Sequence, residues 1–342
     1  MFDSITDQNQ AVSRLMSMIR HGFVPHALLF SGLDGVGKST TARAMAMALN
    51  CRASEASGSV GTTGQPVTQA GEGSCPCRSC RKIMAGTHPD ILTVVPSGGL
   101  IKIAQIRDLC SKLLVKPLEA SMRVVIIHDT HTMNQESGNA LLKMLEEPPE
   151  KTMFILITDQ ASDVLPTILS RCQTVMFTPI PAESIRSRLV SVKGMDAERA
   201  DVITCLAGGS LGKAMALCDE RQNRPDPLVF RRYLFAEFEG LLKGGLFDAL
   251  SFAEKLSRKK ETALNALETT LSFIRDLTVF PFDRDRVLNR DIADRLENLS
   301  GRFSTDSLLH MADRVLSAHQ GIKANASVRL CLETMAIQMK RI

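Results

Sequence analysis

The stretch Gly32-Leu33-Asp34-Gly35-Val36-Gly37-Lys38-Ser39 matches a complete P-loop, the Gly-x-x-x-x-Gly-Lys-Ser pattern that cradles nucleotide phosphates. It follows the apolar run Ala27-Leu28-Leu29-Phe30 and precedes a helical pattern that we expect from about 39 to 50. This chemistry requires a strand, a glycine-rich turn and a helix N-terminus, because backbone N–H groups and the helix dipole then favour an anion. The sequence therefore predicts that the chain binds ATP or ADP.

The residues of the P-loop take separate roles in this prediction. Lys38 is expected to reach the β and γ phosphates, and Ser39 to hold Mg²⁺ when nucleotide is bound. The alternative, a chance glycine-rich turn between a strand and a helix, is disfavoured by the full spacing and context. The remaining nucleotide-binding candidates are Gly32, Gly35, Gly37 and Thr40.

The strand end that should supply two acidic groups for ATP hydrolysis is short of one of them. Turnover needs one acid to hold Mg²⁺ and a base to orient water, usually at the end of the next central strand. The buried run 124–127 leads instead into His128-Asp129-Thr130. Either His128 takes the metal position, where a neutral imidazole is a poor Mg²⁺ ligand, or Asp129 takes it and leaves Thr130 as the base. The sequence predicts weak or absent hydrolysis, with Asp129 as the catalytic candidate of a degenerate site. A strand that simply ends at the surface explains these residues equally well.

Strands and helices alternate in the first half of the chain, which predicts an α/β fold with a parallel sheet covered on both faces. After Pro179 and Pro181 only helical patterns follow. We expect a P-loop domain at 1–178, a small helical lid at 179–222 and an all-α C-terminal domain at 223–342. The expected strands are 27–30, 91–95, 124–127, 154–157 and 174–177, and the expected helices between them include 103–114 and 139–147.

Composition narrows the function classes. The chain has 342 residues, a net charge of +4, no Trp and one Tyr. The scarcity of Trp and Tyr disfavours base-stacking platforms of the single-strand-binding type, and the mild charge permits nucleic-acid contact without indicating it. Neither a leader pattern nor a membrane-length apolar run is present, so we expect a cytoplasmic protein with no membrane contact. Its nine Cys then indicate metal ligands or buried thiols rather than disulfides. Residues 53–74 are rich in Gly, Ser and Thr and are predicted to form a mobile loop.

Three further motifs accompany the P-loop: Thr-His-Pro-Asp at 87–90, Asn-Ala-Leu-Leu-Lys-Met-Leu-Glu-Glu-Pro-Pro at 139–149, and Leu-Pro-Thr-Ile-Leu-Ser-Arg-Cys at 165–172. Together they resemble the clamp-loader branch of the AAA+ ATPases. Residues 1–15 and 25–32 look most like the delta-prime type of subunit in bacterial DNA polymerase III. The resemblance is dense to about residue 215 and thin beyond it.

The resemblance implies a hetero-oligomeric ring with gamma/tau-type and delta-type subunits, which places a sliding clamp on primed DNA. In that family delta-prime is the rigid member, and the arginine of its Ser-Arg-Cys motif, here Arg171, points at ATP held by a neighbour. The family's sensor-1 residue falls at or near Thr158. From Ser170-Arg171-Cys172 alone, an ordinary surface arginine is the alternative.

Two departures from the family's motor subunits favour a stator. Motors carry Asp-Glu where this chain has His128-Asp129, and an Arg in a Gly-Ser-x-Arg motif where this chain has Gly212. Lys213 lies one position further, about 100° around a helix. The competing hypothesis is an ATP-hydrolysing gamma/tau-type motor that uses Asp129. A third class, an AAA+ protein unrelated to replication, would lack the combined motifs at 139–149 and 165–172.

The resemblance also implies a structural zinc module, here an insertion at 51–85. The family usually carries two Cys-x₂-Cys steps, whereas here Ser74 stands at one expected position and Cys75 is shifted by one. Chelation remains feasible, because a Cys-x-Cys in extended chain puts both sulfurs on one side. Free thiols are the alternative. The predicted Zn²⁺ ligands are Cys51, Cys75, Cys77 and Cys80.

Overall fold

The structure, a computed structural model, describes residues 2, 5–51, 75–218, 226–289 and 292–340. Its chain divides into two compact units, the first Met1–Arg188 with Ala207–Ala216 and the second Leu189–Leu206 with Leu217–Ile342. The predicted lid, 179–222, is shared between these units, and the three-domain division stays a prediction. The predicted mobile loop at 53–74 lies outside the described residues.

A five-stranded parallel sheet forms the centre of the first unit. Its strands are β1 (Ala27–Ser31), β2 (Ile91–Val94), β3 (Arg123–Ile127), β4 (Thr152–Thr158) and β5 (Gln173–Met176). Their order is β2-β3-β4-β1-β5, so the strand before the P-loop lies between β4 and β5. Ser31 pairs with Thr158, which brings the residues that follow β4 to the P-loop. Every predicted strand is present.

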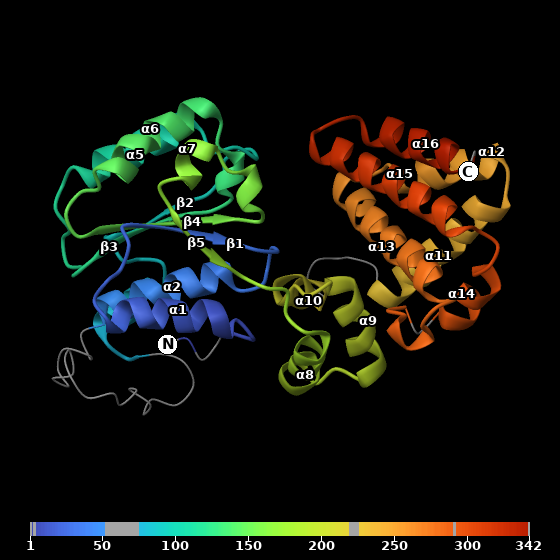
Figure 1. The fold of residues 1–342 in the computed structure, drawn as a ribbon, viewed down its shortest axis with the longest axis horizontal. Helices are drawn as coiled ribbons and strands as arrows, with labels where there is room; N and C mark the ends of the chain where they lie inside the picture. The colour runs from blue at the N-terminus through green and yellow to red at the C-terminus, as the bar shows by residue number, and fades with distance from the viewer. Residues whose placement is uncertain (1, 3–4, 52–74, 219–225, 290–291, 341–342) are drawn as a thin grey trace. The chain divides into compact units, whose positions relative to one another are not determined.

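Helices cover both faces of this sheet (Figure 1). One face packs against α1 (Asn9–Arg20), α2 (Lys38–Asn50) and α4 (Arg78–Met84), and the other against α5 (Ile103–Leu113), α6 (Gln135–Glu146) and α7 (Pro166–Leu169). Alternation along β1 explains the division, because Leu28 and Phe30 face the first layer and Leu29 the second. Each of these fully buried side chains stabilises the fold by about 1.5–3 kcal/mol.

Two helices differ from the sequence prediction. Helix α6 begins at Gln135 rather than 139, because the side-chain oxygen of Asn134 accepts a hydrogen bond of 2.9 Å from the backbone N–H of Ser137. Helix α4 follows Cys77, where the sequence analysis named no helix. There the Cys77 sulfur caps the helix by accepting from the N–H of Cys80 at 3.4 Å.

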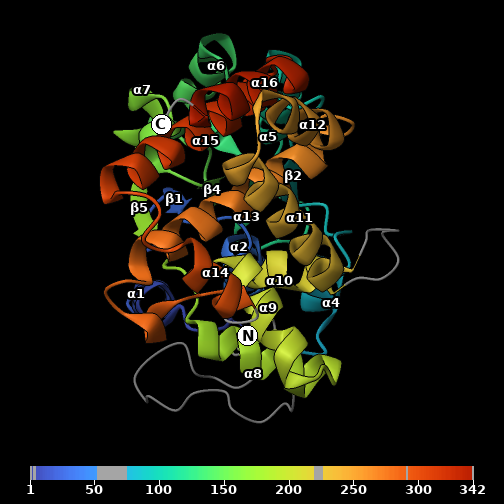
Figure 2. The same cartoon turned by 90° about the vertical axis from the view of Figure 1, so that its right-hand side faces the viewer.

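The second unit is helical. Its core includes Phe235, Phe238 and Phe273, with the rings of Phe235 and Phe273 edge to face at 5.0 Å. Helix α15 (Thr305–Lys323) packs on both α13 (Lys260–Val279) and α16 (Val328–Met339), and α12 (Leu246–Leu256) packs on α16 (Figure 2).

The predicted fold class, a P-loop α/β domain followed by helices, is confirmed. The other helices described in the chain are α8 (Ala182–Lys193), α9 (Ala197–Ala207), α10 (Leu211–Leu217), α11 (Pro227–Lys243) and α14 (Ala293–Leu299). Short 3₁₀ turns are η1 (Thr130–Thr132), η2 (Ala161–Asp163) and η4 (Arg284–Arg286).

Within the described ranges, every helix falls short of the length or apolar character that a membrane span needs.

A buried carboxylate fixes the loop between α5 and β3. Asp90, 1% exposed, accepts hydrogen bonds of 2.8–2.9 Å from the backbone N–H groups of Leu118, Glu119 and Ala120. The Arg123 guanidinium lies 3.6 Å away. Burial by itself raises the pKa of Asp90, but the three N–H groups and Arg123 outweigh it and hold the pKa below its ordinary value.

This lowered pKa predicts an acid-sensitive contribution to stability. A carboxyl whose pKa is depressed by folding stabilises the protein above its unfolded pKa of about 4, and the contribution is lost as pH falls through the folded pKa. We expect Asp90→Asn to lower the free energy of unfolding by about 1–3 kcal/mol at pH 7. The difference from wild type should shrink as pH falls from about 5 toward 2 in urea titrations followed by circular dichroism. A difference independent of pH would contradict this assignment.

Candidate nucleotide site and cysteine cluster

The backbone of the P-loop is built from glycines in conformations that other residues rarely adopt. Gly35 and Gly37 have φ of 74° and 106°, and Gly37 precedes the first residue of α2 as a left-handed cap. At Gly32, with φ of 152°, an added Cβ would lie 2.3 Å from the carbonyl oxygen of Phe177. The loop therefore requires glycine at these positions, as expected for a turn that brings backbone close to phosphate.

The side chain of Lys38 is turned into its own loop. It is 4% exposed, and its Nζ donates to the carbonyl oxygens of Gly32 and of Leu33, the latter at 2.9 Å. The third partner is the Asp159 carboxylate, whose Oδ1 lies 3.1 Å from Nζ. Asp159 directly follows β4, and its carbonyl oxygen also accepts from the N–H of Gly32 at 3.1 Å. Lys38 thus joins the P-loop to the end of the neighbouring strand.

The predicted metal position is occupied by an imidazole. Nδ1 of His128 lies 3.3 Å from the Ser39 hydroxyl, whereas Asp129 is exposed and begins the η1 turn with φ of 48°. Of the two registers considered for this strand end, the geometry therefore matches the one with His128 beside Ser39. Burial, and to a lesser extent Arg43, lowers the pKa of His128 despite the opposing charge of Asp129. The ring is then neutral at pH 7 and a poor ligand for Mg²⁺.

The other candidates from sequence flank this site. Thr158, 1% exposed, ends β4 and donates its hydroxyl to the carbonyl oxygen of Gln160 at 3.0 Å. Thr40 is half-buried in the first turn of α2. Both lie on elements that meet at the P-loop, since β4 pairs with β1, which precedes the loop, and α2 begins at the end of the loop.

Gly212 lies directly against the P-loop. Its N–H donates to the carbonyl oxygen of Gly35 at 2.8 Å, and an added Cβ would lie 2.8 Å from the Gly35 Cα. A side chain at 212 therefore requires the two segments to separate. An arginine at this position, expected from the resemblance only in a motor subunit, therefore does not fit this conformation.

Arg171 lies between α7 and β5, on the surface of the first unit. Its side chain is 36% exposed, and one guanidinium nitrogen lies 2.6 Å from Oε1 of Glu146, the last residue of α6. The other terminal nitrogen donates to the carbonyl oxygen of Thr167 at 2.9 Å and to the Ser170 hydroxyl at 3.2 Å. The guanidinium is therefore held at the surface rather than buried in the fold. Beside it, burial raises the pKa of Cys172 to about 12, which leaves that thiol unreactive at neutral pH.

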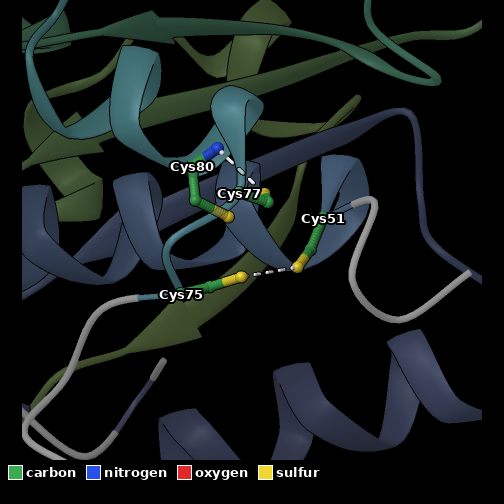
Figure 3. Close-up of side chains that lie close together, drawn as sticks. All are labelled: Cys51, Cys75, Cys77 and Cys80. Atoms are coloured by element: carbon green, nitrogen blue, oxygen red, sulfur yellow. Dashed lines mark hydrogen bonds between the residues drawn. The ribbon is translucent and has the colours of Figure 1, made fainter. Parts of the chain in front are cut away.

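The four predicted metal ligands come together (Figure 3). Cys51 follows α2, Cys75 and Cys77 precede α4, and Cys80 lies within it. Their sulfurs all lie within 4.8 Å of one another, and those of Cys51 and Cys75 are 3.5 Å apart. Tetrahedral zinc with Zn–S bonds of about 2.3 Å separates its sulfurs by about 3.8 Å, so the set fits a closed Cys₄ site. Burial raises the pKa of Cys80 and of Cys75, so both thiols stay protonated unless a cation compensates their charge.

Two residues of this region were not singled out from sequence, Asp159 and Glu146. Asp159 carried a usable signal, because a carboxylate directly after a buried strand lies at the sheet edge where a parallel fold places its ligand. Glu146 stood inside a quoted motif, but its pairing with Arg171 depends on how α6 and α7 pack.

The chain is similar to several known proteins. The chain is 26% identical over 344 residues to DNA polymerase III subunit delta' of Bacillus subtilis (strain 168), with 98% of each chain covered. It is 25% identical over 362 residues to subunit tau of the same organism, with 99% of this chain and 61% of tau covered. A solved DNA polymerase III gamma subunit-related protein from Thermotoga maritima is similar over 96% of this chain and 98% of its own, with 17% identity and a TM-score of 0.41.

The profile of the family described as "DNA polymerase III, delta subunit" matches residues 7–181, which is more than half of the chain. The matched range runs from before α1 to beyond β5 and contains the P-loop, Arg171 and the cysteine cluster. The chain therefore belongs to this family of clamp-loader-type DNA polymerase III subunits.

Proposed function

We propose that this chain is the delta-prime-type stator of a DNA polymerase III clamp loader. It joins gamma/tau-type and delta-type subunits in a ring that places the sliding clamp on primed DNA, and it lends Arg171 to ATP held by a neighbour. The similarity to subunit delta' over 98% of both chains supports this choice within the family.

The observation that carries the proposal is the imidazole of His128 beside Ser39, 3.3 Å from the hydroxyl that would hold Mg²⁺. Hydrolysis needs a carboxylate at that position, and the nearest acid along the chain, Asp129, is exposed. A P-loop of this kind is suited to bind ATP or ADP through its glycines, Lys38, Ser39 and Thr40, with Thr158 near the γ-phosphate. It is poorly suited to cleave it.

Two further parts of the chain take structural roles in this proposal. The cysteine cluster holds one Zn²⁺, which ties the end of α2 to α4 and does no chemistry. The helices α11 to α16 form the part of the ring through which the subunits associate, and residues 179–222 act as the lid of the P-loop domain.

Measurement of ATP turnover separates the stator from the motor alternative. The purified chain is expected to hydrolyse ATP no faster than its Lys38→Ala variant, because the carboxylate pair is missing. Its addition to the remaining loader subunits, clamp and primed DNA should nevertheless raise both their ATPase rate and clamp loading. Brisk hydrolysis by the isolated chain that disappears in Lys38→Ala would overturn the stator and favour a gamma/tau-type motor.

A further inference from the structure

We propose that the P-loop of this chain is held closed by an internal latch, in which Asp159 competes with nucleotide phosphate for Lys38. The latch consists of the contacts of Lys38 with Asp159 and the loop carbonyls, and of the contact between Gly35 and Gly212. The inference rests on the nucleotide binding in the proposed function and adds how that binding is regulated.

The hydrogen bonds of the Lys38 ammonium form the first part of the latch. A lysine ammonium has three donors, and here its partners are the carbonyl oxygens of Gly32 and Leu33 and the carboxylate of Asp159. A β or γ phosphate must therefore displace at least one of them before it is bound by Lys38. The side chain of Lys38 is also only 4% exposed, so a partner that is lost must be replaced within the loop.

Asp159 is the partner that disfavours phosphate most. Its carboxylate neutralises the charge that should attract the nucleotide, and its own negative charge repels a polyphosphate placed beside Lys38. The side chain of Asp159 is 46% exposed. Solvent therefore screens the ion pair, and a phosphate can approach the carboxylate from outside. Nucleotide is thus able to displace Asp159 but binds with an affinity reduced by the population of the closed state.

The contact between Gly35 and Gly212 forms the second part of the latch. The N–H of Gly212 donates to the carbonyl oxygen of Gly35, and the two glycine backbones approach too closely for a Cβ at either position. At Gly35 an added Cβ would lie 2.3 Å from the Ser210 hydroxyl. The segment at 210–212 therefore packs directly against the turn, and this contact restrains the loop in the conformation in which Lys38 is paired with Asp159.

Titration calorimetry with MgATP and with ADP tests the latch on the full chain. We expect Asp159→Asn to bind either nucleotide at least about fivefold more tightly than wild type, because the ion pair and the repulsion are both removed. Lys38→Ala should abolish the gain in the Asp159→Asn background. The matched control is Asp163→Asn, which removes an exposed carboxylate four residues away and should leave the affinity unchanged.

The outcomes separate the latch from the stator. Equal or weaker binding by Asp159→Asn, with a wild-type circular dichroism spectrum and melting temperature, overturns the latch. If that variant is unfolded, the same comparison is made with Asp159→Ser. Absence of binding in every variant also overturns the latch, while leaving the role of Arg171 to be judged by loader ATPase. Tighter binding together with brisk hydrolysis supports the latch and overturns the stator.

Discussion

Replacing Arg171 by alanine is expected to slow ATP hydrolysis at the neighbouring subunit's site by about 10³-fold, while the folded chain still joins the loader. A guanidinium supplied in trans neutralises the charge that develops on the transferring γ-phosphoryl group, and fingers of this kind contribute about 10³–10⁵-fold to the rate. The side chain makes only surface contacts, so the loss of stability should be small.

The pairing of Arg171 with Glu146 is weak enough to be exchanged. An ion pair between side chains that are 36% and 49% exposed contributes at most about 1 kcal/mol, because solvent screens it. A 10³-fold rate effect corresponds to about 4 kcal/mol of transition-state stabilisation. On the proposed function we therefore expect the guanidinium to favour the neighbour's phosphate over Glu146 once the ring has assembled, with Glu146 as its partner until then.

The experiment compares loaders reconstituted with wild type, Arg171→Ala, Glu146→Gln and Arg20→Ala, measured by ATPase with clamp and primed DNA. Arg20 is an exposed arginine at the end of α1 and serves as the matched control. Glu146→Gln keeps the finger and should retain most of the activity. If the loader with Arg171→Ala hydrolyses ATP at the wild-type rate, the arginine has no role in trans.

The elements of the first unit were largely predictable, because each depends on a local pattern. The buried strand Val124 to Ile127 and the P-loop are each one continuous stretch of sequence. Their apolar runs predict how helices cover the sheet and which residues lie along its edge. The sequence analysis was less successful where one polar side chain determines the first residue of a helix. The Asn134 cap places the start of α6 about one turn before the predicted residue, and the Cys77 cap begins α4 where no apolar periodicity is visible.

The contacts of the site were less predictable than its residues. Lys38, Ser39, His128 and Arg171 were all named from sequence, but the partners of Lys38 and Arg171 are not local. Asp159 reaches Lys38 only because β4 and β1 are paired in parallel with Ser31 opposite Thr158. Such registers depend on the whole sheet, so a motif alone predicts which groups are available and not which of them bind each other.

Loss of zinc is expected to disrupt α4 while the sheet remains folded. This helix has seven residues, too few to be stable in water by itself, so its order depends on contacts such as the cysteine cluster. Structural zinc bound by four thiolates contributes folding free energy directly, on the order of 10 kcal/mol in small zinc modules. We expect one Zn²⁺ per chain in the purified protein.

The Cys77→Ser variant tests how much the metal contributes to the order of α4. Serine is a favoured residue before the first turn of a helix, so it preserves the cap that the Cys77 sulfur provides and removes only the ligand. Zinc content should fall well below one per chain, and amide hydrogen exchange in Arg78–Met84 should rise at least about tenfold, as it should after chelation of the wild type. Cys110→Ser, at a half-buried thiol of α5 outside the cluster, is the control and should keep its zinc. Unchanged exchange in Cys77→Ser, or wild type without zinc, would mean that the four sulfurs are free thiols and that packing alone orders α4.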